Sequence, residues 1–434
     1  MRHPRRRTLM KLAAATVLAT TGTACSPSGR PAGGAGSAPP PPGGTPVAVS
    51  LPPPTGPWPV GTVDLHLVDR TRPDPLVPSK PFRELMIGVW YPADRRGTSP
   101  VAPWLLPGAA ADWDAHSAPG MTVPAGAVDW RGIRTHARTG APAARSAGRL
   151  PVVLFSSGDG GTRALGTTVV EELASRGYVV VTLDSPYEAD QVEFPGGRVE
   201  RAVPLPDDLT PEVIAELLEK HARARVADAR FVLRRIEALA AGRNPDAGGR
   251  PLPAGLPEVL DTSRTGMFGQ SLGGSVAAQL AHDDPRVRAA ANLDGELVGP
   301  VAHTGVTGPY LLMVSDGKPP AAEPGGSTPR PGSPGPRITL LLRDARHGSY
   351  TDLQVVLPQV TAHLPVPAAP ELIGTVDPRR SLAAQRAALT AFFDLHLKHR
   401  PTTLFEDPGA RFPELRIVNR ADGGRSSRTP SAPA

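Results

Sequence analysis

The chain has 434 residues, of which 40% are apolar, so it can bury a sizeable core and is too apolar to be fully disordered. It carries 47 Lys and Arg against 41 Asp and Glu, a formal charge of +6. Five of the bases lie in residues 1–24, which hold no acid, so the remainder has 42 bases against 41 acids, a charge of +1. This balance argues against nucleic acid as a partner.

Residues 1–24 have the parts of an export signal. A basic stretch, 2–11, precedes an uncharged and mainly apolar stretch of 13 residues, 12–24, which is too short to span a bilayer. The basic stretch contains RRRTLMK at 5–11, which resembles a twin-arginine export signal. We therefore predict that the protein is exported and that the signal peptide ends at residue 24.

Cys25 follows the signal and is the only cysteine, so no intramolecular disulfide can form. The residues before it, TGTA at 21–24, resemble a bacterial lipobox. We expect Cys25 to be lipidated and to anchor the protein on the outer face of the cell membrane. The alternative is cleavage nearby, which would leave a free thiol on a secreted protein.

Two segments have the composition of unfolded chain. Residues 26–60 contain twelve Pro, seven Gly and a single charged residue, Arg30, so we expect 25–60 to be an extended linker. Residues 421–434 are expected to form a disordered tail. The folded domain should therefore occupy 61–420.

Within that domain, strands and helices are expected to alternate. An early pair of strands is predicted at 63–68 and 85–91, followed by loops and at most one short helix over 93–148. Further on, apolar runs predict strands, periodic stretches predict helices, and a segment rich in Pro, Gly and Ser forms an insertion at 317–336. The later strands are 151–155, 178–183, 265–268, 287–293, 310–315 and 338–342, and the helices are 163–176, 211–240, 272–282 and 378–399. This alternation predicts one α/β domain whose mostly parallel sheet has helices on both faces.

One pentapeptide carries the chemistry. Gly269-Gln270-Ser271-Leu272-Gly273 is a G-x-S-x-G motif between a predicted strand and a predicted helix, the context of the nucleophile elbow of the α/β-hydrolase fold. The turn is so tight that side chains two residues before and after the serine would clash, and both positions are glycine. Ser271 is thus the predicted nucleophile, at the positive end of a helix.

A serine nucleophile needs a base and an acid, which follow it in chain order in this fold. His347 lies just after the strand at 338–342, where a loop would return it to the elbow, and is the predicted base. Asp294 and Asp316 each follow a strand, and the pattern alone does not choose between them as the acid.

The oxyanion of the reaction needs two backbone N–H donors. We expect one from Leu272, directly after the nucleophile. The other should come from Asp159, in the glycine-rich loop GDGG at 158–161 that follows the strand 151–155. No group of His, Asp and Glu has the spacing of a metal site, and no cofactor is expected.

Several further segments, at their separations along the chain, are more specific than the pentapeptide alone. Together with it they resemble the platelet-activating factor acetylhydrolase family of α/β-hydrolases, in its bacterial exported branch. The resemblance covers most of 61–420. The segments are RELMIGVWYP at 83–92, FSSG at 155–158, GQSLGG at 269–274, NLDG at 292–295, HGSYTD at 347–352, GTVDP at 374–378 and AFFD at 391–394.

The resemblance implies that Asp294, soon after the nucleophile helix, is the acid of the triad. It also implies a serine esterase that releases short acyl groups from phospholipids or other small ester substrates, at a membrane surface if Cys25 is lipidated. Two alternatives remain: a broader lipase or cutinase-like polyester esterase, and a catalytically silent lipoprotein that uses the fold for binding.

Overall fold

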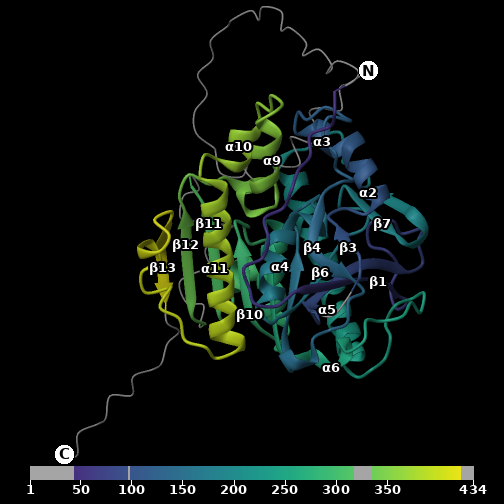
Figure 1. The fold of residues 1–434 in the computed structure, drawn as a ribbon, viewed down its shortest axis with the longest axis vertical. Coiled ribbons are helices and arrows are strands. Elements are labelled where there is room, and N and C mark those ends of the chain that lie inside the picture. The colour runs from purple at the N-terminus through teal and green to yellow at the C-terminus, as the bar shows by residue number, and fades with distance from the viewer. Residues whose placement is uncertain (1–43, 96–97, 317–334, 422–434) are drawn as a thin grey trace, which may run out of the picture.

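The computed structural model describes residues 44–95, 98–316 and 335–421, and within them an eleven-stranded sheet crosses the molecule in the order β13-β12-β11-β10-β9-β5-β6-β2-β1-β4-β3 (Figure 1). Its strands are β1 (Val60–Asp69), β2 (Arg83–Pro92), β3 (Val101–Pro103), β4 (Arg134–Thr139), β5 (Leu150–Ser156), β6 (Val179–Leu183), β9 (Leu260–Gln270), β10 (Val287–Leu293), β11 (Tyr310–Ser315), β12 (Arg337–Leu342) and β13 (Leu415–Ala421). The six strands from β12 to β6 are parallel, whereas β13 and β2 pair antiparallel at the two ends of this block. The prediction of a mostly parallel sheet is confirmed.

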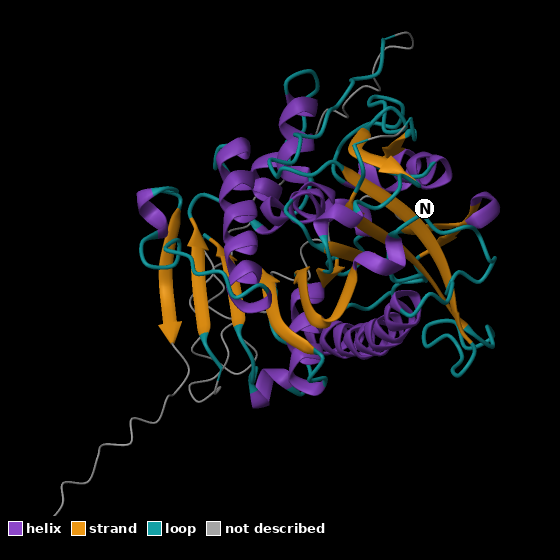
Figure 2. Ribbon diagram, turned by 60° about the horizontal axis from the view of Figure 1, so that its bottom comes forward, coloured by secondary structure: helices purple, strands orange, loops and turns teal. Residues whose placement is uncertain are grey.

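Helices cover both faces of the sheet (Figure 2). Val153 and Phe155 of β5 belong to one apolar cluster with α4, α9 and α11, while Val152 and Leu154 belong to the other cluster with α5 and α7. Because successive strand residues point to opposite faces, a strand buried on both sides must be apolar throughout. The helices are α2 (Pro107–Asp112), α3 (Ala118–Gly120), α4 (Thr167–Ser175), α5 (Pro211–Ala240), α6 (Leu256–Val259), α7 (Leu272–Asp283), α8 (Val301–Thr304), α9 (Leu353–Thr361), α10 (Ala369–Ile373) and α11 (Pro378–Leu397).

The segment 93–148 is more structured than expected. It holds β3 and β4, which extend the sheet, and a helical stretch in which the π-helix η2 (Trp113–Ser117) joins α2 to α3. Trp113 packs there against Trp104 and Trp130, with ring centroids 5.9 Å from each. These three indoles supply a core that a composition rich in Ala, Gly and Arg does not predict. A separate hairpin of β7 (Gln191–Phe194) and β8 (Arg198–Arg201) was also not expected.

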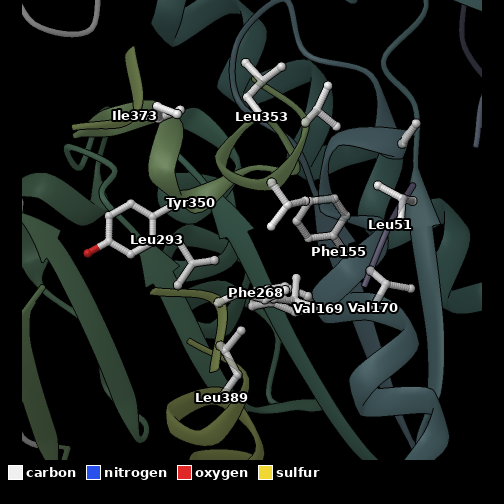
Figure 3. Packing of buried hydrophobic residues seen from close by; sticks show 14 of the residues in the cluster. Leu51, Phe155, Val169, Val170, Phe268, Leu293, Tyr350, Leu353, Ile373 and Leu389 are labelled. Carbon is white, nitrogen blue, oxygen red and sulfur yellow. The ribbon is translucent and has the colours of Figure 1, made fainter. Parts of the chain in front are cut away.

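Residues 44–60 are part of the domain, so the prediction of a linker that runs to residue 60 is wrong for them. Leu51 is buried and belongs to the same cluster as Val170 of α4, as Figure 3 shows. Thr55 donates from its amide and its hydroxyl to the carboxylate of Glu172, both at 2.7 Å. Arg386 donates to the carbonyls of residues 52 and 53. Side chains of the folded domain therefore satisfy this proline-rich backbone, which lacks several N–H groups of its own.

Several predictions concern residues outside the described part. The signal peptide, Cys25 and the linker up to residue 43 lie there, as do 317–334 of the predicted insertion and 422–434 of the predicted tail. Ala421, the first residue of the predicted tail, instead ends β13. None of the helices in the described ranges has the length and apolar character needed to cross a bilayer.

Candidate active site

Ser271 lies between β9 and α7 in a backbone conformation, φ 55° and ψ −125°, that non-glycine residues rarely adopt. The glycines on either side permit this turn. A Cβ added at Gly269 would lie 2.2 Å from the carbonyl carbon of Gly273, and one added at Gly273 would lie 2.0 Å from the carbonyl oxygen of Ser156. Both distances are far inside van der Waals contact, so the strand, the turn and the helix can only approach this closely without side chains there.

His347 contacts Asp294: Asp294 directly follows β10, and His347 lies in the loop after β12, with β11 between these two parallel strands. Asp294 follows β10, is fully buried, and accepts the ring Nδ1 of His347 at 2.7 Å. Ser315 at the end of β11 also contacts this carboxylate: its amide donates at 2.8 Å and its hydroxyl donates at 3.0 Å. Tyr350 lies near the same carboxylate, and burial together with the charge of Asp294 raises the pKa of its phenol. Ser315 therefore fixes the orientation of the Asp294 carboxylate, and this carboxylate in turn fixes the orientation of the imidazole.

Asp316 has different neighbours. Its Oδ2 accepts the amide of Asp344 at 3.2 Å, and its carbonyl accepts Arg346 at 3.2 Å. It helps to shape the loop that carries His347, whereas the carboxylate in contact with the imidazole is that of Asp294.

The second ring nitrogen of His347 is held by Gln270. The side-chain amide nitrogen of Gln270 lies 3.1 Å from Nε2 of His347. Because Asp294 accepts the proton on Nδ1, Nε2 is the acceptor of the neutral ring and Gln270 is the donor. Between Ser271 and His347 themselves, both within the described part, the structure has no hydrogen bond. Such contacts are often long in enzymes without substrate and tighten when it binds.

The glycine-rich loop after β5 passes directly beside Ser271. A Cβ added at Gly158 would lie 3.1 Å from the Cβ of Ser271 and 2.3 Å from Oε1 of Gln270. The turn is closed by the amide of Gly161, which donates to the carbonyl of Gly158 at 3.0 Å. Asp159 sits inside this turn, and Leu272 is the first residue of α7, so its amide has no partner within the helix. The two predicted oxyanion donors therefore flank the nucleophile.

These residues line one pocket of about 110 Å³. Its walls combine the polar groups described above with an apolar side made by Trp113 and Met121 of the α2–α3 stretch, Leu218 of α5, and Leu165 and Leu353. The segment that was predicted to be mostly loop therefore covers the pocket. A few polar groups at one end of an apolar pocket are typical of a small-molecule site.

Asp159, Glu188 and His221 are the one group in the described residues whose ligand atoms lie close enough together for a metal ion. The Nδ1 of His221 lies 2.7 Å from Asp159 and 3.8 Å from Glu188. However, Arg225 donates to both oxygens of Glu188. A guanidinium thus already supplies the positive charge that a metal ion would bring, so this group does not fit a metal.

The family model described as "Platelet-activating factor acetylhydrolase, isoform II" matches residues 45–403. The chain belongs to this family. A family relative from Arthroderma benhamiae, named "Probable 1-alkyl-2-acetylglycerophosphocholine esterase", is 25% identical over 281 residues, which is 61% of this chain and 65% of the relative. The chain thus spans slightly less than two thirds of that relative.

One solved structure is similar to this chain over most of its length. It is a ferulic acid esterase from Streptomyces cinnamoneus, 32% identical, with a TM-score of 0.67 over 86% of this chain and 99% of that one. The α/β-hydrolase fold predicted from the sequence is confirmed by this likeness and by the mostly parallel sheet.

Sequence reasoning missed several residues of this site. Gln270 was part of the motif, but its contact with His347 depends on a loop 77 residues away. Ser315 ends the predicted strand 310–315, and this position at the end of a parallel strand could have indicated a contact with Asp294. Glu188, His221 and Arg225 had no local signal, because their meeting depends on how α5 packs against the loops after β5 and β6.

Proposed function

We propose that this protein is a serine hydrolase of carboxylic esters. The proposal rests above all on the 2.7 Å contact of His347 with Asp294 in the pocket that also contains Ser271 at a glycine-flanked elbow. A buried carboxylate that fixes the imidazole tautomer leaves Nε2 unprotonated, the form in which this nitrogen can act as a base. The esterase names of the two relatives support the same reaction class.

In the proposed reaction, Ser271 Oγ attacks the ester carbonyl while its proton passes to Nε2 of His347. The amides of Leu272 and Asp159 donate to the oxyanion, and Asp294 stabilises the imidazolium. The intermediate collapses to an acyl-serine as the leaving alcohol takes the proton from His347. Water then attacks the acyl group, its proton passing through His347 back to Ser271, and the carboxylic acid leaves.

We propose short acyl groups on lipid esters as the substrate class, as in 1-alkyl-2-acetylglycerophosphocholine hydrolysis. The family and the name of the fungal relative support it. A second candidate is an ester of an aromatic acid, because the ferulic acid esterase is similar over 99% of its own length and Trp113 offers an aromatic wall to the pocket. Both candidates use the same Ser271 chemistry and differ only in the acyl group.

The test compares wild type with Ser271→Ala. We expect a fluorophosphonate to label wild type but not the variant, and p-nitrophenyl ester hydrolysis to fall to background in the variant. A series from acetate to palmitate, with a 2-acetyl phospholipid and methyl ferulate, identifies the preferred acyl group. A folded wild type that is neither labelled nor active on any of these would contradict the proposal and favour a binding role.

We further propose that the protein is exported and held at the outer face of the cell membrane by a lipid on Cys25. The export signal and the lipobox-like residues before Cys25 support this. In the native host, Cys25→Ser should move the protein from the membrane fraction to the medium, while the matched Ser26→Ala should not. Equal fractionation of the two variants would contradict the anchor.

A further inference from the structure

A buried charged cluster lies behind the oxyanion loop and is not part of the triad. It consists of Asp159 in that loop, Glu188 in the loop after β6, and His221 and Arg225 one turn apart on α5. The side chains of Glu188, Arg225 and His221 are 1%, 2% and 5% exposed, and that of Asp159, which borders the pocket, is 21% exposed. Ionisable groups this deeply buried are costly unless each is paired.

Arg225 holds the backbone of the oxyanion loop. Its guanidinium donates to the carbonyl of Ser157, to the carbonyl of Gly158 at 2.9 Å and to the hydroxyl of Ser156 at 3.1 Å. Glu188 accepts from the same guanidinium with both carboxylate oxygens and so fixes its plane. A planar fork of this kind reaches two successive carbonyls at once, which an ammonium cannot do.

The hold on Gly158 has a consequence for the next amide. The carbonyl of Gly158 and the N–H of Asp159 belong to one trans peptide group and therefore point in opposite directions. Because Arg225 on α5 binds the carbonyl, the N–H points away from α5. The loop also borders Ser271, and Asp159 lines the pocket with it. Arg225, together with the turn hydrogen bond from the Gly161 amide to the same carbonyl, thus sets the direction of the proposed oxyanion donor.

The side chain of Asp159 would by itself oppose this function, because a carboxylate near a developing oxyanion repels it. His221 accounts for its direction, since Nδ1 contacts the Asp159 carboxylate at 2.7 Å from the α5 side. Burial alone would raise the pKa of Asp159, but the hydrogen bond and charge of His221, helped by Arg225, lower it to about 2. The carboxylate is therefore ionised and held inside the cluster.

We propose that Arg225 and His221 are positioning residues of the oxyanion hole: Arg225 orients the peptide group between Gly158 and Asp159, and His221 holds the Asp159 carboxylate away from the oxyanion. This inference rests on the proposed esterase function. Neither residue touches the reacting atoms, so each should affect the stabilisation of the transition state and leave the binding of the ground-state ester unchanged.

The first experiment replaces Arg225 by Lys and by Gln, with Arg223→Gln on the exposed side of α5 as the matched control. Steady-state hydrolysis of p-nitrophenyl acetate should show kcat lowered about 10- to 100-fold with KM within about twofold for the Arg225 variants, and both constants unchanged for the control. Fluorophosphonate labelling should slow in parallel. An unchanged kcat, or a raised KM at constant kcat, would overturn the role of Arg225.

The second experiment uses two variants that keep Arg225, so it tests the role of His221 even if the Arg225 variants do not fold. His221→Ala should lower kcat about tenfold by releasing a charged carboxylate beside the oxyanion. Adding Asp159→Asn to His221→Ala removes that charge and should restore most of the loss. A double variant as slow as His221→Ala would overturn the charge argument.

The same measurements keep this inference distinct from the proposed function. A wild type that does not hydrolyse esters, or whose activity survives Ser271→Ala, contradicts the esterase itself. An active, Ser271-dependent wild type whose Arg225 and His221 variants keep full kcat contradicts only the positioning role.

Discussion

The side-chain amide of Gln270 lies 3.1 Å from Nε2 of His347, the ring nitrogen that would take the proton of Ser271. The neutral ring accepts this hydrogen bond, whereas a protonated ring would face the amide with a second donor. Gln270 therefore favours the neutral imidazole, which is the form that acts as the base.

Gln270→Glu reverses this preference by placing a carboxylate beside Nε2. The charge stabilises the imidazolium, so the acid limb of the kcat/KM profile should move to higher pH by about one unit. Gln270→Met, of similar size and without charge, should move it less. A Gln270→Glu profile that superimposes on wild type would show that the 3.1 Å contact is not maintained in the working enzyme.

Asp294 and Asp316 offer a matched pair of carboxylates at the ends of adjacent strands. Asp294→Asn should leave the imidazole in the wrong tautomer and lower kcat by roughly 10³- to 10⁴-fold. Asp316→Asn, which alters the side chain that accepts the Asp344 amide and keeps the backbone carbonyl that accepts Arg346, should stay within roughly threefold of wild type. Melting curves of both variants distinguish loss of chemistry from loss of fold, and equal losses of kcat in the two folded variants would contradict the assignment of Asp294.

Glu171 of α4 gives the stability of the fold a pH dependence. Burial and the nearby charge of Asp352 raise its pKa to about 7 from an ordinary 4.5, against the hydrogen bond from the amide of His136, and its Oε2 is a buried oxygen without a partner in the described structure. Between about pH 4.5 and pH 7, Glu171 is therefore protonated in the folded protein and ionised in the unfolded chain. This group lowers the free energy of unfolding as pH rises through that window, by at most about 1.4 kcal/mol per pH unit. Glu171→Gln should remove the part of this slope that belongs to Glu171 and stabilise the protein at pH 8, with little effect at pH 4.5. Asp352, whose pKa burial also raises to about 7, should keep its own part.

The neighbouring Glu172 provides a control of opposite sign. Burial would raise its pKa, but the hydrogen bonds from the amide and hydroxyl of Thr55 and from Arg176 lower it below 4.5. Its contribution to stability is present above pH 4.5 and is lost as the pH falls through its lowered pKa. Glu172→Gln should therefore destabilise the protein at pH 7 and less so at acidic pH. Urea unfolding of both variants from pH 4 to 8 measures the two slopes, and parallel curves for the two would contradict both assignments.

The N-terminal segment supplies a prediction about domain boundaries. A chain that starts at residue 61 lacks Leu51, worth about 1.5–3 kcal/mol when buried, and the two Thr55 hydrogen bonds to Glu172. It should melt at a clearly lower temperature than a chain that starts at residue 44. Leu51→Ala in the longer chain should reproduce part of the loss, whereas equal melting temperatures for the two chain lengths would mean that the segment does not contribute to the stability of the domain.

Periodicity and local turn chemistry carried most of the prediction of the fold. The long helix expected at 211–240 is α5, and the six parallel strands lie where apolar runs predicted them, because a strand buried on both faces must be apolar along its whole length. The proline-rich composition of residues 44–60 gave a wrong prediction, because a hydrogen bond from the Thr55 amide to Glu172 and others from Arg386 order a backbone that has little secondary structure of its own.

By itself, the sequence determined the nucleophile elbow, since its geometry depends on glycines within five consecutive residues. It also determined the alternation of strands and helices, which places Asp294 and His347 after strands of a mostly parallel sheet. The tertiary structure alone decided which carboxylate contacts His347, what holds Nε2, and which charges lie behind Asp159. Those contacts join residues between 53 and 77 positions apart, and they depend on the rotation of α5 and the paths of loops. Hydrophobic patterning specifies which face of an element is buried, but a hydrogen bond between two such elements requires their relative placement to within a fraction of an ångström.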